Sequence, residues 1–245
     1  MYFNLLLPDI RNCSAGSMKK MPISGTCSCW ALRKGKSGVR WRRRGEAPGG
    51  FDAEASSDRV ARYSKRQMAL AYIGMGANLR SSVGDPAATL AIAAERLGAY
   101  GRIQAWSSLY RTSPVGFLDQ PDFVNAVVAF EADLGPRLLL RRLLEIEAEF
   151  GRDRLQSIVN GPRTLDLDML IVGDLVLHEA GLDLPHPRMA QRAFVLIPLR
   201  EIAPGLVEPR SRATVAALLE SLDADQPGAL SSVTLLRGRD WLAAR

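Results

Sequence analysis

Hydrophobic and polar residues follow two alternating patterns from about residue 69 onward. Short apolar runs, or runs that alternate with polar residues, are typical of strands, whereas apolar residues three and four apart line one face of a helix. We therefore expect strands at residues 69–74, 103–111, 123–132, 165–172 and 175–178. We expect helices from Pro86 to about Gly98, from Pro136 to Phe150, and in two shorter C-terminal segments, 192–201 and 214–222.

Local signals mark the ends of these elements. Asp85 stands directly before a proline, a pair typical of a helix start, and Gly151 is placed to stop the second helix. Gly173-Asp174 is expected to form a hairpin turn into segment 175–178. The resulting order is β-α-β-β-α-β with a C-terminal addition. It predicts an α+β fold of the ferredoxin-like class, in which two helices pack on one face of an antiparallel sheet.

Charge divides the chain into two parts near Met68. Residues 1–67 contain 14 Lys and Arg against 5 acidic residues, whereas residues 68–245 contain 18 Arg, no Lys and 21 acidic residues. The first part has no sustained period and is rich in Gly, Ser and Arg, so it buries too little apolar surface to offset its ordering entropy. We expect residues 1–67 to be a mostly disordered basic extension and residues 68–245 to be a single domain.

Two interpretations of the extension stay open. Arg40 and Arg42–Arg44 suit an acidic partner such as a nucleic acid. We favour the simpler interpretation, a solvated tail or an upstream stretch included by a wrong choice of start codon. Cys27 and Cys29 have no matching His or Cys for a zinc site.

Cysteine usage and hydropathy limit the compartment and the partners. All three cysteines precede residue 68, so the folded part needs no disulfide. No apolar stretch approaches the roughly 20 residues that span a bilayer. We therefore expect a cytoplasmic protein with no membrane partner.

Two carboxylates lie close together on the strand predicted at 165–172. Side chains two residues apart share one face of a strand, so Asp166 and Asp168 form a pair while Leu167 faces the other way. Like charges that close repel each other unless a cation lies between them, and Mg²⁺ prefers carboxylate oxygens completed by water and phosphate. Taken alone, the pair is more simply explained as two ordinary acids at a solvent-facing strand.

Arginines around this strand favour the metal interpretation. Arg152, Arg154 and Arg163 precede it in one polar loop, and Arg192 follows in another. Guanidinium groups bind phosphate oxygens in a bidentate fork, so the set describes a site for a magnesium-bound polyphosphate. The sequence has no Walker loop, no lysine after residue 65, no nucleophile elbow and only two histidines. These absences argue against a P-loop kinase, a serine hydrolase and a His-rich zinc site.

A second set of residues suits a flat heterocycle. Asn125 lies on the strand predicted at 123–132, where Asn is depleted, and its amide both donates and accepts hydrogen bonds. Phe123 and Phe194 offer two rings to sandwich a planar ligand, although such residues more often lie in a core. Segment 112–121 is too long for a tight hairpin and is typical of a binding loop.

Five segments of the chain match, in order, the motifs of one enzyme family. They are residues 71–79, 107–116, 119–126, 161–168 (Gly-Pro-Arg-Thr-Leu-Asp-Leu-Asp) and 185–189. Over about residues 69–210 the chain resembles the 6-hydroxymethyl-7,8-dihydropterin pyrophosphokinase (HPPK) family. The resemblance implies a Mg²⁺-dependent transfer of pyrophosphate from ATP to that pterin in folate biosynthesis, giving AMP and the pterin diphosphate. The implied partners are these small molecules and, by extension, other enzymes of the folate pathway.

The resemblance also implies roles for individual residues. The catalytic set would be Arg152, Arg163, Asp166 and Asp168, with two Mg²⁺ ions held by the two aspartates. The pterin would be bound by Thr112, Val115, Gly116, Phe123, Asn125 and Phe194. ATP would be bound by Glu147, Arg152, Arg154, Arg163, His186 and Arg192. We further expect Asp168 to take the hydroxyl proton, and loops 113–122 and 152–162 to order when both substrates bind.

Three positions depart from the family pattern. Ala77 stands where Ser is common, Asn160 where some members have Trp, and Pro187 where some have Tyr. These departures bear on loop packing and nucleotide affinity.

Two rival functions stay open. One rival is a nucleic-acid-binding module built on the sheet and the basic extension. The net charge of −3 over residues 68–245 argues against it, so we expect the folded domain to bind no nucleic acid. The other rival, a two-metal phosphodiesterase, would hydrolyse its substrate without an acceptor.

Overall fold

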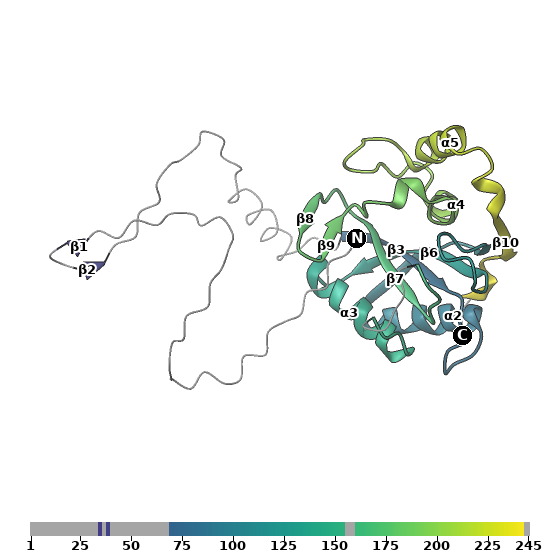
Figure 1. Ribbon diagram of the computed structural model, residues 1–245, viewed down its shortest axis with the longest axis horizontal. Helices are drawn as coiled ribbons and strands as arrows, with labels where there is room; N and C mark the ends of the chain where they lie inside the picture. Colours follow the sequence, from purple (N-terminus) through teal and green to yellow (C-terminus); the bar gives the residue numbers. More distant parts are fainter. Residues whose placement is uncertain (1–33, 36–37, 40–68, 155–159, 243–245) are drawn as a thin grey trace, which may run out of the picture. The chain divides into compact units, whose positions relative to one another are not determined.

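A computed structural model of the protein describes residues 34–35, 38–39, 69–154 and 160–242 (Figure 1). By its internal contacts the chain divides into two units, Met1–Val60 and Ala61–Arg245. Among the described residues, no helix is both long and apolar enough to cross a membrane.

The first unit is described only in part. Strands β1 (Lys34–Gly35) and β2 (Gly38–Val39) form a short antiparallel pair. The basic cluster at Arg40 and Arg42–Arg44 and the three cysteines lie outside the described residues. The disorder expected for residues 1–67 therefore stays a prediction.

The second unit contains the helices that the sequence predicts. Its strands are β3 (Ala69–Ala77), β4 (Gly101–Trp106), β5 (Leu109–Thr112), β6 (Phe123–Ala132), β7 (Asp166–Val172), β8 (Leu177–Glu179), β9 (Leu182–Leu184) and β10 (Val233–Arg237). Its α-helices are α2 (Pro86–Leu97), α3 (Pro136–Glu149), α4 (Ala193–Ile202) and α5 (Val215–Asp225). Short 3₁₀ helices are η1 (Gly98–Tyr100), η2 (Met189–Gln191), η3 (Leu230–Ser232) and η4 (Arg239–Trp241). As predicted, Asp85 caps α2, because its side chain accepts a hydrogen bond from the Ala88 N–H (2.9 Å).

Among the described residues, six strands form one antiparallel sheet in the order β10-β5-β6-β3-β7, with β4 also paired to β6. Strand β6 pairs with β4 along 128–132 and with β5 along 123–125. The single strand predicted at 103–111 is therefore two strands, interrupted at Ser107. The Ser107 N–H donates to the Val127 carbonyl (2.9 Å), and its hydroxyl accepts from the Val127 N–H (3.0 Å). Strand β10, which the sequence analysis missed, pairs with β5 at one edge.

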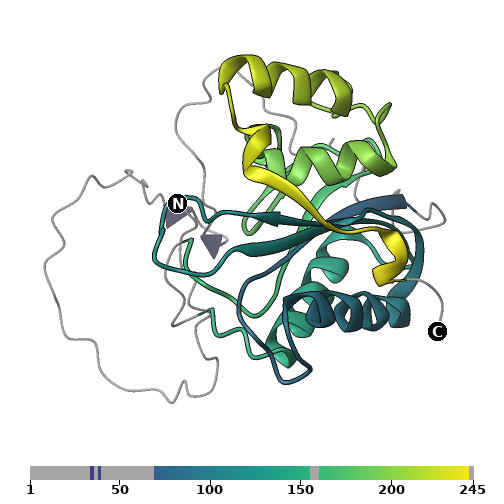
Figure 2. The same cartoon turned by 90° about the vertical axis from the view of Figure 1, so that its right-hand side faces the viewer.

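Helices cover both faces of this sheet (Figure 2). On one face α2 and α3 form a core in which Leu90 and Leu143 pack with Phe130 of β6. On the other face α4 and α5 form a second core, where Leu196 packs with Val127 of the same strand. Strand β6 is buried on both sides, which explains why it is apolar at nearly every position. The C-terminal addition therefore supplies a second helical layer.

The hairpin predicted at Gly173-Asp174 was wrong. The chain does turn there, because the Leu175 N–H donates to the Val172 carbonyl (3.0 Å), but β8 pairs with β9 and not with β7. The chain returns to β7 only after β9, where the His186 N–H donates to the Leu170 carbonyl (2.8 Å). This return occupies the edge of β7 that the predicted hairpin needed.

Candidate active site

The carboxylate pair lies at the start of β7. Asp166 and Asp168 stand opposite two glycines of β3, Gly76 and Gly74, in the register of the sheet. Leu167, between them, packs in the core under α2 and α3, as the alternation predicts. The pair therefore faces the layer of α4 and α5, with small residues beside it on the neighbouring strand.

Two arginines hold Asp166. Arg152 Nη1 donates to one carboxylate oxygen of Asp166 and to the Leu165 carbonyl (3.1 Å), and Arg163 Nη1 donates to the other oxygen (2.8 Å). Burial alone would raise the pKa of Asp166, but the charges of Arg152 and Arg163 hold it below its usual value. Asp166 is therefore ionised at neutral pH, in direct contact with two of the arginines that the sequence places near it.

Glu147 joins this network from α3. Its side chain is 1% exposed, and Oε1 accepts hydrogen bonds from Arg152 Nη1 (2.8 Å) and from the Leu167 N–H (2.8 Å). Its other oxygen accepts from Arg154 Nε (2.9 Å). Burial raises the pKa of Glu147 to about 7, against the opposing charges of Arg152 and Arg154. A cavity of about 440 Å³ lies against these three charged side chains.

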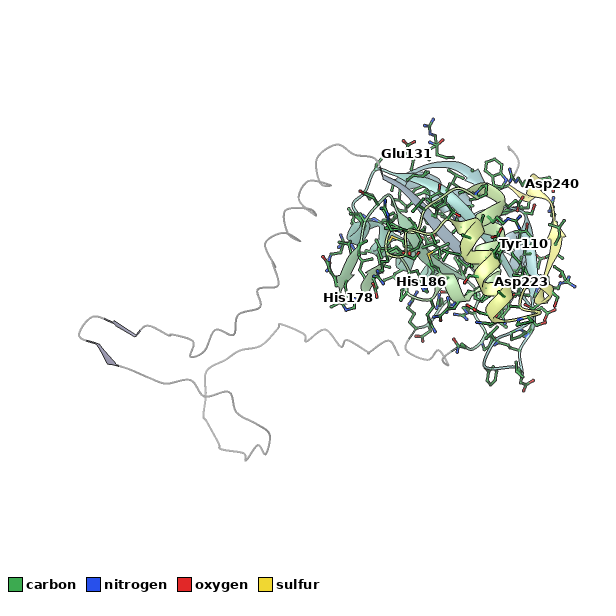
Figure 3. The ribbon with its side chains drawn as sticks, turned by 90° about the horizontal axis from the view of Figure 1, so that it is seen from above. Tyr110, Glu131, His178, His186, Asp223 and Asp240 are labelled. Atoms are coloured by element: carbon green, nitrogen blue, oxygen red, sulfur yellow. The ribbon has the colours of Figure 1, made fainter. Side chains whose placement is uncertain are left out.

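Asp168 faces a different set of side chains. Its Oδ2 lies 3.8 Å from Arg192 Nη1 and 3.9 Å from His186 Nε2, and 38% of the side chain is exposed. Burial and the charge of Asp166 raise the pKa of Asp168 to about 6. Burial and the charge of Arg192 lower the pKa of His186 to about 4, so this imidazole is neutral at pH 7. His186 lies within the body of the domain and His178 at its edge (Figure 3).

The carboxylate pair fits a hard cation that brings further ligands with it. Within the described part of the chain, no group of three or more His, Cys, Asp or Glu side chains is placed to hold a metal. Mg²⁺ usually takes one or two carboxylates and completes its shell with water and substrate phosphates. A carboxylate has about four lone-pair positions. Asp166 is thus able to keep its arginine contacts and still offer an oxygen beside Asp168.

The residues predicted to read a heterocycle edge lie at the same end of the sheet. Asn125 is buried on β6, and its Nδ2 donates to Thr112 Oγ1 on β5 (2.8 Å). Gly76 leaves room for this amide, because a Cβ there would come within 2.9 Å of Asn125 Oδ1. In the following loop Val115 is 70% exposed, and Gly116 has a φ of +90°, a conformation that favours glycine.

Each of the two predicted aromatic rings has an arginine over its face. The guanidinium of Arg163 lies 5.1 Å from the centre of the Phe123 ring, and that of Arg192 lies 5.5 Å from the centre of the Phe194 ring. Since Arg163 also binds Asp166, the aromatic set and the charged set share residues. The sandwich of a planar ligand between the two rings stays a prediction.

Two residues of the site, Asn78 and Gln120, received no role from the sequence. Both lie in the matching segments, and a polar residue such as Asn78 at the end of a buried strand is a usable signal.

The structure describes the three positions that depart from the family pattern. Ala77 is fully buried in the core, and Pro187 is exposed. Asn160 has a φ of +57°, which Asn tolerates, and its carbonyl accepts from Gln120 Nε2 (2.8 Å).

Comparison with known proteins finds one family model and several named relatives. The family model for 7,8-dihydro-6-hydroxymethylpterin-pyrophosphokinase (HPPK) matches residues 72–204. Relatives named 2-amino-4-hydroxy-6-hydroxymethyldihydropteridine pyrophosphokinase include proteins of Synechocystis sp. and Methylorubrum extorquens. The first is 44% identical over 153 residues, which is 62% of this chain and 76% of the relative. The second is 46% identical over 142 residues, which is 57% of this chain and 86% of the relative.

A solved structure supports the fold. Plasmodium falciparum HPPK-DHPS aligns with a TM-score of 0.55 at 14% identity, covering 70% of this chain. This chain spans about half of that one (48%), and at such low identity the likeness shows the fold alone. The family model, in contrast, covers more than half of this chain and includes the carboxylate pair and its arginines. This chain therefore belongs to the HPPK family.

Proposed function

We propose that the chain transfers pyrophosphate from ATP to 6-hydroxymethyl-7,8-dihydropterin, in the presence of Mg²⁺, as a step of folate biosynthesis. The observation that carries the proposal is the convergence of Asp166 and Asp168 with Arg152, Arg163 and Arg192 at one end of the sheet. This set combines oxygen donors for a hard cation with guanidinium groups for phosphate. Membership of the HPPK family supports the same reaction.

In the proposed reaction the hydroxymethyl oxygen of the pterin attacks the β-phosphorus of ATP. The bond from that phosphorus to the oxygen bridging the α-phosphorus breaks, so AMP leaves with that oxygen, and the hydroxyl proton goes to a base. Asp168 is the proposed proton acceptor, because its carboxylate is partly exposed and lies 3.8 Å from Arg192, one of the arginines proposed to bind ATP. The transfer depends on in-line positioning and on neutralised phosphate charge more than on a strong base.

Asp166 and Asp168 are the residues that would hold Mg²⁺, two ions in the family pattern. When bound, the metal neutralises charge on the phosphates. Arg152 and Arg163, fixed by Asp166, are proposed to orient the same phosphates.

The remaining charged residues act around the nucleotide in this proposal. Arg154 is 50% exposed and is proposed to rotate from Glu147 toward ATP, while His186 and Arg192 lie beside Asp168. Because Glu147 is only 1% exposed, we assign it an indirect role, in which it holds the two arginines in position. The pterin would be bound by Thr112, Val115, Gly116, Phe123, Asn125 and Phe194.

Two structural expectations belong to the same proposal. We infer a ferredoxin-like β-α-β-β-α-β plan within one domain from residue 68, supported by the neighbouring order β4-β6-β3-β7 and by the shared face of α2 and α3. We also infer that loops 113–122 and 152–162 order when both substrates bind. Residues 155–159 of the second loop lie outside the described residues.

The test is to incubate the 245-residue chain with Mg²⁺, ATP and 6-hydroxymethyl-7,8-dihydropterin and to separate the nucleotides. We expect AMP to form only when both the pterin and the metal are present. Formation of ADP would instead indicate transfer of a single phosphoryl group. Nucleotide hydrolysis that proceeds equally without the pterin would support a two-metal phosphodiesterase and overturn the proposal.

A further inference from the structure

Asn78 lies at the end of β3, between the loop on the pterin side and the loop that carries Arg163. Its side chain is buried, and its Nδ2 donates to Gln120 Oε1 (2.9 Å) and to the Pro121 carbonyl (2.9 Å). Its Oδ1 accepts from the Arg163 N–H (2.7 Å). One side chain therefore bonds to the main chain of both loops.

The main chain around Asn78 strengthens the contact with Arg163. The N–H groups of Asn78 and Leu79 both donate to the Arg163 carbonyl, at 3.0 and 3.1 Å. Arg163 is thus held at its N–H and at its carbonyl. Its guanidinium continues from this fixed point to Asp166 and over the Phe123 ring.

Gln120 extends the connection on the pterin side. Its Nε2 donates to the Phe117 carbonyl (2.6 Å), inside its own loop, and to the Asn160 carbonyl (2.8 Å), just before the Gly-Pro-Arg segment. With the bond from Asn78, the amide of Gln120 links three points of the chain. Gly116 lies against Asn160 as well, since a Cβ on Gly116 would come within 3.0 Å of Asn160 Nδ2.

The amide of Asn78 has no donor left for a ligand, because both hydrogens of its Nδ2 and one position of its Oδ1 are used within the protein. We propose that Asn78 and Gln120 are a positioning pair that couples the two substrate sites, so that filling one site prepares the other. The inference rests on the proposed function, in which loop 113–122 meets the pterin and Arg163 meets the phosphates. Coupling of this kind requires a connection that both ligands bias.

The experiment compares the wild-type chain with Gln120→Leu, which removes the three side-chain bonds of Gln120 and leaves Arg163 and the aspartates unchanged. Calorimetry measures the affinity for 6-hydroxymethyl-7,8-dihydropterin alone and then with saturating Mg²⁺ and α,β-methylene-ATP, which is not cleaved at the bridging position. We expect the nucleotide analogue to tighten pterin binding of the wild type by about tenfold or more. In Gln120→Leu we expect the tightening to fall to about twofold.

Two further variants make the test specific. Gln120→Glu keeps the shape of the side chain but sets a carboxylate against the carbonyls of Phe117 and Asn160, so we expect the same loss of tightening. Gln104→Leu is the matched control, because the side chain of Gln104 bonds to Glu131, at the opposite end of β6 from Asn125, and we expect this variant to keep the wild-type factor.

The outcomes separate the inference from the proposed function. If wild-type protein forms AMP but both Gln120 variants keep the full tightening of pterin binding, the proposed role of the positioning pair is wrong while the proposed function stands. The same conclusion follows if the wild type forms AMP and shows no tightening. If the wild type forms no AMP under the conditions of the turnover assay, the proposed function itself fails and the inference fails with it.

Discussion

Glu147 and Glu201 are presented by helices on opposite faces of the sheet, and each accepts hydrogen bonds from an arginine and a backbone N–H. Glu201, near the end of α4, accepts from the Ser108 N–H (2.8 Å), the Tyr110 hydroxyl (2.9 Å) and Arg239 Nε (2.8 Å). Burial would raise the pKa of Glu201, but these bonds lower it below its usual value. With the Ser108 hydroxyl (2.9 Å), its partners are three neutral groups and one cation, and this closed set joins α4 to β5 and to the C-terminal segment.

The network of Glu147 is open by comparison. Its arginines continue to Asp166, and together with the groups around Asp168 the network contains four arginines and three carboxylates. Burial keeps the pKa of Glu147 raised, at about 7, in spite of its two arginine partners. The difference shows that two networks, each built on a glutamate and its arginine partners, have different roles. A balanced set stabilises the fold, whereas a set with surplus positive charge suits a polyanionic ligand.

The largest effect expected in the open network is that of Asp166→Asn. The change removes a carboxylate that suits Mg²⁺ and releases Arg152 and Arg163 from their shared partner. We expect kcat/KM for AMP formation to fall by about 10³-fold or more, since a bound metal and its charge contribute several kcal/mol to such transfers. Asp223→Asn, on the exposed surface of α5, is the control and should leave turnover unchanged. A loss smaller than about tenfold for Asp166→Asn would contradict the proposed site.

Glu147→Gln tests whether the buried carboxylate acts through its arginines. The variant keeps the size of the side chain but weakens the grip on Arg152 and Arg154. We expect about 10- to 100-fold lower kcat/KM, the usual cost of losing a residue that orients direct ligands, with KM for ATP rising more than KM for the pterin. Glu220→Gln, exposed on α5, is the matched control. Equal changes in both KM values would argue that Glu147 has a general structural role instead.

Glu201→Gln probes the closed network and should separate stability from activity. The amide lacks the negative charge that strengthens the hydrogen bonds donated by Ser108, Tyr110 and Arg239. We therefore expect the free energy of unfolding to fall by about 2 kcal/mol. For a domain of this size that corresponds to a Tm lower by about 4–8 °C. Thermal unfolding followed by circular dichroism measures it, and kcat/KM measured at 25 °C should stay within about twofold. If activity fell as far as in Glu147→Gln, the distinction between the two networks would be lost.

Elements that depend on neighbouring residues could be predicted from the sequence. Asp85 and its following proline fix the start of α2, and strand 123–132 has the predicted bounds. The pairing of Asp166 with Asp168 on one strand face follows from the period of a strand alone. The division of the strand at Ser107 could not be predicted in this way, because it depends on bonds to Val127, 20 residues later.

The missing parts of the site have the same physical cause. The bond from the Arg163 N–H to Asn78 joins residues 85 positions apart, and the bond from Asn78 to Gln120 spans 42 positions. Neither residue type nor local spacing indicates such partners. The hairpin expected at Gly173-Asp174 failed because the edge of β7 is taken by the later segment at His186. Local patterns therefore locate the reactive groups, whereas the contacts that hold them depend on the assembled sheet.

The smallest effect we predict is the absence of a titration, and it reports the combined effect of burial and of the arginines around His186. Burial and the charges of Arg192 and Arg188 lower the pKa of His186 to about 4. Its contribution to stability is therefore present above its ordinary pKa of 6.5 and is lost as the pH falls through about 4. In metal-free protein, ¹H–¹⁵N NMR of the imidazoles should show His186 neutral from pH 8 down to 5.5. The chain has only one other histidine, His178, which is 90% exposed and gives a reference signal in the same spectra. A midpoint for His186 above about 6 would mean that the charge of the nearby carboxylates, Asp166 first, outweighs both burial and the arginines, so the site would carry no effective positive surplus. Binding of ATP would then depend on the metal to supply the missing charge.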